Sequence, residues 1–145
     1  MHCGALRPLF FELQFSSMTT EAATTENDRP NLVNMPDEEL FAVAHPMWDD
    51  LVKYSNKGQY GKFVLKFSYN LLFGLNEVEM GKQFEKSGLT RSLDPNWDFL
   101  GTIRRGEHVP MLYRMRSTKK PGEWLGRMVL GYEDGEVKIF GASVF

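Results

Sequence analysis

Hydrophobic positions follow two different periods along the chain, one near 3.6 residues and one of two. From Pro36 onward, Leu40, Ala44 and Leu51 recur at helical spacing, which is typical of a helix with one buried face. A proline suits the first helical turn, and Lys57-Gly58 suits a helix end. The pattern therefore predicts one long helix in this region.

Two shorter helices are expected before the period changes. Pro46 removes one backbone hydrogen bond inside the first helix, which predicts a kink or a split near His45. Residues 59–68 place aromatic side chains at helical spacing and predict a second, short helix. Residues 76–87 begin with a capping-box pattern and end before Gly88, so they predict a third helix.

Apolar residues alternate with polar ones after residue 98, which is the period of a half-buried strand. The Asp134-Gly135 pair is typical of a tight hairpin turn. Alternate residues of the second expected strand share one inward face: Val109, Met111, Tyr113 and Met115. Together these signals predict four strands, over residues 99–105, 108–117, 122–132 and 136–145.

Helices followed by a run of hairpin-connected strands indicate an α+β fold. We expect N-terminal helices packed on one face of a curved four-stranded antiparallel sheet. A curved sheet over helices leaves a concave space, so the pattern also predicts a cone with a pocket. Glycines inside the expected strands favour bulges and curvature: Gly101, Gly126, Gly131 and Gly141.

The first 35 residues lack either period, and we interpret them as a flexible leader to a single domain over residues 36–145. Residues 18–39 hold six acidic side chains against one arginine, a net charge of −5. Residues 40–145 hold 15 basic and 12 acidic side chains, a net charge of +3. The leader is expected to be disordered, to carry a targeting signal, or to precede a true start at Met18.

Composition narrows the compartment and the partners. Cys3 is the only cysteine of the 145 residues, so no internal disulfide can form, which fits a reducing compartment. No apolar run reaches the roughly 20 residues that a membrane-spanning helix needs. A net charge of −2 gives no general attraction to nucleic acid. We expect a soluble cytoplasmic protein with no membrane contact; import into an organelle through the N-terminal extension stays open.

Three stretches of the chain resemble the nuclear transport factor 2-like superfamily, also described as the cystatin-like α+β cone. They are NKGQYGKF, the hairpin FLGTIRRG…VPMLYRMRS, and the closing LGRMVLGYEDGEVKIFGASVF. The resemblance covers about residues 36–145. It implies a pocket between sheet and helices and a homodimer formed through the sheet. Members include ketosteroid-isomerase-like and polyketide-cyclase-like enzymes, dehydratases, and non-enzymatic binding or assembly modules.

Large apolar side chains at inward positions are the candidates for lining such a pocket. The same spacing is typical of a packed core. The bound molecule would be small and either apolar or anionic. The candidate ligand-binding residues are Trp48, Tyr60, Phe63, Met111, Tyr113 and Met128.

His45 and Asp49 are the weak catalytic candidates. They are four residues apart and so share one face of the expected helix. A carboxylate there could orient the imidazole as a general base; the alternative is a solvated helix face. His45 and His108 have no ligand spacing with a third residue, so we expect no metal and no cofactor.

The second expected hairpin is rich in basic side chains. An anionic ligand, an acidic partner or single-stranded nucleic acid could bind such a surface. The alternative, which we favour, is a solvated sheet face whose charges discourage edge pairing. The residues are Arg104, Arg105, Arg114, Arg116, Lys119 and Lys120.

The sequence therefore favours a binding or accessory module with a pocket. The alternative is a pocket enzyme, an isomerase, cyclase or hydratase, with His45 or Asp49 as the base. A third hypothesis is a structural interaction domain whose sheet is buried, through an apolar face, against a partner. Which way His45 and Asp49 point in the fold distinguishes the first two hypotheses.

Overall fold

The computed structural model describes residues 32–75, 88–104 and 106–145 of the chain. Helices pack with an open four-stranded antiparallel sheet, which confirms the expected α+β class. The third expected helix, residues 76–87, lies outside the described residues. In chain order the elements are η2 (Leu32–Asn34), α2 (Asp37–Lys57), α3 (Tyr60–Phe63), α4 (Tyr69–Phe73), η3 (Leu89–Arg91), β1 (Asp98–Thr102), β2 (Val109–Met115), β3 (Trp124–Glu133) and β4 (Glu136–Val144).

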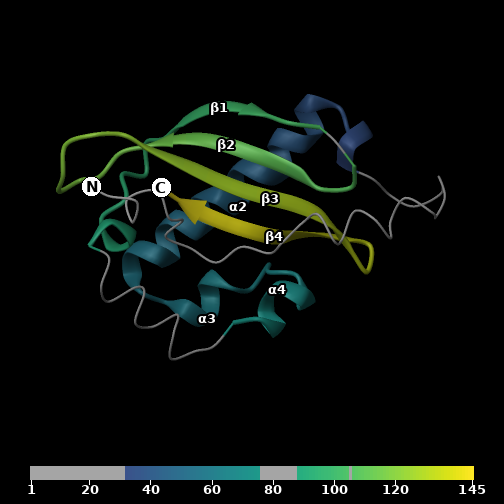
Figure 1. Cartoon of the computed structure of the whole chain (residues 1–145), viewed down its shortest axis with the longest axis horizontal. Coiled ribbons are helices and arrows are strands. Elements are labelled where there is room, and N and C mark those ends of the chain that lie inside the picture. The colour runs from purple at the N-terminus through teal and green to yellow at the C-terminus, as the bar shows by residue number, and fades with distance from the viewer. Residues whose placement is uncertain (1–31, 76–87, 105) are drawn as a thin grey trace.

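Helix α2 crosses one face of the sheet, and α3 and α4 lie beyond β4 (Figure 1). The start and end of α2 are those that its sequence predicts. Acidic side chains fill its first turn, where they complement the positive end of the helix dipole. Gly58 adopts the left-handed conformation with φ +67°, and the Gln59 N–H donates to the Tyr54 carbonyl at 3.0 Å.

Pro46 lies inside α2 without splitting it, so of the two expected outcomes, a kink or a split near His45, the split is not found. The helix is continuous over 21 residues. Proline removes a single backbone hydrogen bond, whereas Ala44 and Trp48 on either side of it are both fully buried. Packing against the sheet therefore holds the two halves together as one helix.

The helix expected over residues 59–68 is shorter than predicted, because α3 ends at Phe63 and the next helix, α4, begins at Tyr69. Between them the backbone pairs with the edge of the sheet. The Ile139 N–H donates to the Lys66 carbonyl at 2.7 Å, and the Ser68 N–H donates to the Ile139 carbonyl at 2.8 Å. These hydrogen bonds with β4 replace helical ones, so a tertiary contact overrides the local preference.

The four strands pair in the order β1-β2-β3-β4, as the sequence predicts. Asp134 and Gly135 form the turn between β3 and β4, with φ of 55° and 79°, the two positive φ angles that a tight hairpin of this type needs. The inward face of β2 is confirmed, since its four residues have no exposed surface: Val109, Met111, Tyr113 and Met115.

The strand glycines serve two purposes. The pairing register shifts beside Gly101 in β1 and again next to Val129 in β3, so irregularities of the expected kind are present. Gly126 instead permits a close approach of α2. A Cβ atom at Gly126 would lie 2.5 Å from the Trp48 ring and 2.9 Å from the Met115 side chain.

The packed part of the chain begins before the boundary that we placed at residue 36. Leu32 opens η2 and is fully buried in the core. The Arg104 guanidinium donates to three backbone carbonyls of residues 32–35 and pairs with the Asp37 carboxylate. This arginine therefore ties the start of α2 to the end of β1.

Candidate functional site

Most of the expected ligand-binding residues lie in the packed core. Four of the six have no exposed surface: Trp48, Met111, Tyr113 and Met128. The Trp48 and Tyr113 rings stack with their centroids 4.8 Å apart, and the Trp48 indole donates to the Met115 sulfur at 3.4 Å. Side chains fill the space between α2 and the sheet at this point, and a ligand pocket among these residues stays a prediction.

The other two expected residues lie on α3. Phe63 is buried and lines a cavity of about 80 Å³ between α2, α3 and β4. Tyr60 is half-buried and packs against the core without lining this cavity. A pocket for a drug-sized ligand holds roughly 300–1,000 Å³. The cavity therefore suits one short aliphatic chain or one side chain.

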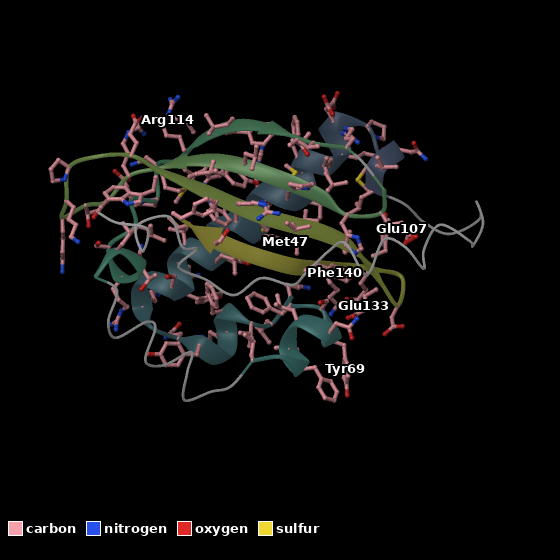
Figure 2. All side chains as sticks on the ribbon, in the orientation of Figure 1. Met47, Tyr69, Glu107, Arg114, Glu133 and Phe140 are labelled. Atoms are coloured by element: carbon pink, nitrogen blue, oxygen red, sulfur yellow. The ribbon has the colours of Figure 1, made fainter. Side chains whose placement is uncertain are left out.

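The inner wall of the cavity is apolar. Leu51 of α2, Phe63 of α3 and Ile139 of β4 are all nearly fully buried there; we call these three residues the apolar floor. Met47 of α2 lines the cavity as well and is half-exposed, and Figure 2 labels it. The floor thus joins α2 and α3, which are neighbours in the sequence, to β4 near the C-terminal end.

The charged lining of the cavity is mostly basic. Lys62 and Lys66 are exposed and form what we call the basic rim. The Lys62 ammonium nitrogen lies 5.8 Å from the centroid of the Tyr54 ring, which also lines the cavity. Among the described residues that line the cavity, Asp50 is the one carboxylate, so the rim favours an anionic group over a cationic one.

His45 points into the fold rather than out to solvent. Its Nδ1 atom lies 3.1 Å from the Tyr113 hydroxyl oxygen. Burial lowers the pKa of His45, and the Asp49 carboxylate opposes this effect only in part. The imidazole is therefore neutral at pH 7. Its ring packs at centroid distances between 4.9 and 5.3 Å against Phe41, Trp97 and Phe99.

Asp49 lies beside this imidazole at the surface. It is exposed, and its Oδ1 atom accepts a hydrogen bond from the Trp97 indole at 2.8 Å. Burial, and then the charge of Asp49, raise the pKa of Tyr113, so the hydroxyl stays protonated. The sequence pattern brings His45 and Asp49 to one helix face, but it gives no sign that Trp97 and Tyr113 join them, because those contacts cross 48 and 68 residues of chain.

Two of the basic side chains, Arg114 and Arg116, face acidic side chains in and next to the sheet. Arg116 donates to the Asp98 carboxylate at 2.8 Å, and this hydrogen bond is the main reason that the pKa of Asp98 is lowered. Arg114 lies 3.6 Å from Asp98 and 3.5 Å from Glu123. These arginines therefore form an exposed ion-pair network and are not a bare cationic surface.

Exposed apolar side chains gather on residues 65–73, next to the cavity. Leu65 is 66% exposed and also lines the cavity, so this residue belongs to both features. The Tyr69 N–H donates to the Glu133 carboxylate at 2.9 Å, and Figure 2 labels both residues where α4 meets the β3–β4 hairpin. The α3–α4 surface, as we call it, consists of Leu65, Tyr69, Leu72 and Phe73.

No family model, no curated protein and no solved structure matches the chain. In the part of the chain that the structure describes, no helix is both long and apolar enough to cross a membrane. Within the same residues, no cluster of histidine, cysteine and acidic side chains could hold a metal ion. The functional argument therefore starts from the fold and from the geometry of the cavity and of His45.

Proposed function

We propose that the protein is a binding or accessory module of the nuclear transport factor 2-like type, and that it binds its ligand in the cavity between α2, α3 and β4. The observation that carries this proposal is the apolar floor next to the basic rim, Lys62 and Lys66. The ligand then has a short apolar part and an anionic end. A cytoplasmic location is part of the proposal, supported by the single cysteine.

The size of the cavity limits the affinity for a small molecule. Burial of apolar surface contributes about 25 cal/mol per Å², and a short chain offers little of it. A Kd of about 1 mM corresponds to about −4.1 kcal/mol, which is a reasonable expectation for a ligand of the size of hexanoate. The apolar floor then takes the alkyl chain and the rim takes the carboxylate.

A titration of the ¹³C-methyl spectrum with hexanoate tests the proposal. We expect the methyl signals of Leu51 and Ile139 to shift, while those of Met115 and Met128 in the closed core stay in place. Hexylamine carries the same chain with a positive end, so it should bind more weakly. Equal shifts with hexanoate and hexylamine would argue against an anionic ligand.

A matched pair of variants tests whether hexanoate binds in this cavity. Met47→Trp adds volume to the cavity wall from a half-exposed position and should abolish the hexanoate shifts. Val43→Trp introduces the same side chain one turn earlier on α2, at a half-exposed position that does not line the cavity, and should leave the hexanoate shifts intact. Unchanged binding in Met47→Trp would overturn the location.

A pocket enzyme is the second candidate function, and the geometry of His45 favours it. A neutral imidazole hydrogen-bonded to Tyr113 and flanked by Asp49 has the groups for proton transfer in an isomerase, cyclase or hydratase. Tyr113 has no exposed surface, so its hydroxyl reaches no substrate in this packing. Deuterium uptake from D₂O at the α-carbon of cyclohexanone, lost in His45→Gln, would support the enzyme; no catalysed uptake would exclude this proton-transfer reaction for that substrate.

We also propose that the module forms a homodimer through the sheet, as the resemblance implies. Leu100 and Ile103, in and just after the edge strand β1, are 47% and 50% exposed, and such apolar surface supports a contact there. Native mass spectrometry should show a dimer that the Leu100→Lys, Ile103→Lys double variant converts to a monomer. A monomeric wild type at micromolar concentration would contradict the dimer.

A further inference from the structure

We propose that an acidic peptide segment of a partner protein docks on the α3–α4 surface and inserts one large apolar side chain into the cavity. The inference rests on the proposed function, because it uses the same cavity, and it names the class of partner. Three independent features of the described residues carry it: the concentration of exposed apolar side chains, the size of the cavity, and the sign of the charge around it.

The exposed apolar side chains are concentrated in one place. Six large apolar residues are substantially exposed in the described part of the chain, and four of them fall within residues 65–73. Phe73 is 76% exposed and Tyr69 is 65% exposed. A contiguous apolar patch on a surface of this kind typically marks an interaction site.

The patch is held in a fixed shape, so a partner meets a preformed surface. The Ser68 hydroxyl accepts a hydrogen bond from the Leu71 N–H at 3.1 Å and caps α4. Leu71 of α4 is buried, and the Tyr69 N–H donates to the Glu133 carboxylate. Binding to a preformed surface loses less conformational entropy than binding to a mobile one.

The cavity supplies the anchor point for this patch. Its volume of about 80 Å³ suits one apolar side chain, and its floor consists of nearly fully buried residues. Leu65 belongs to both the cavity lining and the exposed patch, so a side chain in the cavity has apolar contacts around it. A buried anchor surrounded by contacts that exclude water is the arrangement that dominates binding energy at protein interfaces.

The charge around the cavity favours a partner segment with acidic residues. Among the described residues, Lys62 and Lys66 line the cavity and the Lys53 ammonium lies 5.0 Å from the centroid of the Tyr54 ring, which also lines it. The acidic groups nearby are Asp50 in the lining and Glu133 beside Tyr69. Complementary charge accelerates association and suppresses wrong partners. Acidic residues on both sides of the apolar anchor therefore fit this surface best.

Fluorescence anisotropy with a dye-labelled peptide, GDEFEDG, tests the proposal on the full chain. We expect saturable binding that weakens as salt is raised. Replacing the peptide phenylalanine by alanine should weaken binding by about tenfold or more, equivalent to about 1.4 kcal/mol. Equal binding of the two peptides would show that no side chain enters the cavity and would overturn the proposal.

Two charge-reversal variants distinguish the effect of the basic rim on peptide binding from the effect of the protein's net charge. Lys62→Glu, Lys66→Glu should weaken binding by about tenfold, whereas Lys119→Glu, Lys120→Glu makes the same change of net charge in the exposed loop before β3 and should stay within about twofold of wild type. Leu65→Ser, at an exposed position, should also lose binding. An equal loss in both charge-reversal variants would overturn the docking site.

The failure of this inference is distinguishable from failure of the proposed function. If hexanoate shifts the Leu51 and Ile139 methyl signals but the peptide does not bind, the cavity serves a small molecule and the peptide proposal is wrong. If the peptide does not bind but vesicles containing phosphatidylserine do, the α3–α4 surface meets a lipid and the peptide proposal is again wrong. If neither hexanoate nor peptide binds, both proposals fail.

Discussion

At the residue scale, the burial of two histidines links the stability of the fold to pH. Burial lowers the pKa of His45 and of His108 in the folded state. The unfolded chain, with histidine pKa values near the ordinary 6.5, therefore binds protons first as the pH falls. The free energy of unfolding should be highest above pH 6.5 and should decrease as the pH falls below 6.5.

Unfolding by denaturant at pH 7.5 and pH 5.5 measures this pH dependence. His45→Gln removes one of the two groups and should reduce the loss of stability between the two pH values. His108 should account for the remaining loss. A wild-type free energy of unfolding that rises from pH 7.5 to pH 5.5 would contradict the lowered pKa values.

The close contact between Gly126 and Trp48 predicts that a larger residue at position 126 lowers the free energy of unfolding. Gly126→Ala places a Cβ atom 2.5 Å from the Trp48 ring, and overpacking of a closed core costs about 1–3 kcal/mol. Gly61→Ala is the matched control, since a Cβ there meets nothing within 4 Å and its position is helical; it should stabilise by about 0.5 kcal/mol. Chemical denaturation of both variants measures the difference, and equal stabilities would contradict the packing described.

At the element scale, local signals predict the elements that local forces determine. The Asp134-Gly135 turn and the alternation in β2 need no distant partner, and both are found as expected. Residues 59–73 differ because their backbone bonds to Ile139, which is far away in the sequence. Likewise, Pro46 breaks no helix because the core on either side holds it. Long-range contacts explain the short α3 and are consistent with the unbroken α2.

At the element scale, the hydrogen bonds of Arg104 predict how its substitution changes stability. It donates to backbone carbonyls on both sides of Asn34 and pairs with Asp37, a geometry that lysine cannot reproduce. Arg104→Lys should lower the free energy of unfolding by about 1–2 kcal/mol and increase hydrogen exchange at residues 32–40. Arg114→Lys alters exposed ion pairs and should cost less than about 0.5 kcal/mol; equal losses would contradict the role of Arg104.

At the scale of the whole molecule, the sequence predicts the helix–sheet arrangement better than it predicts the site. Helical spacing is enough to place His45 next to Asp49. The cavity brings together α2, α3 and β4 because α3 ends early, and no local signal gives that ending. Trp48 and Tyr113 look like pocket residues in the sequence, but their spacing cannot show that they stack on each other and fill the space.

The central claim is that the ligand lies in the cavity between α2, α3 and β4. Intermolecular nuclear Overhauser effects between the alkyl protons of hexanoate and the protein methyl groups test it most directly. We predict effects to the methyl groups of Leu51 and Ile139, and their loss in Met47→Trp. Effects to Met111 and Met128 instead would place the ligand between α2 and the sheet, and would contradict the location of the binding site.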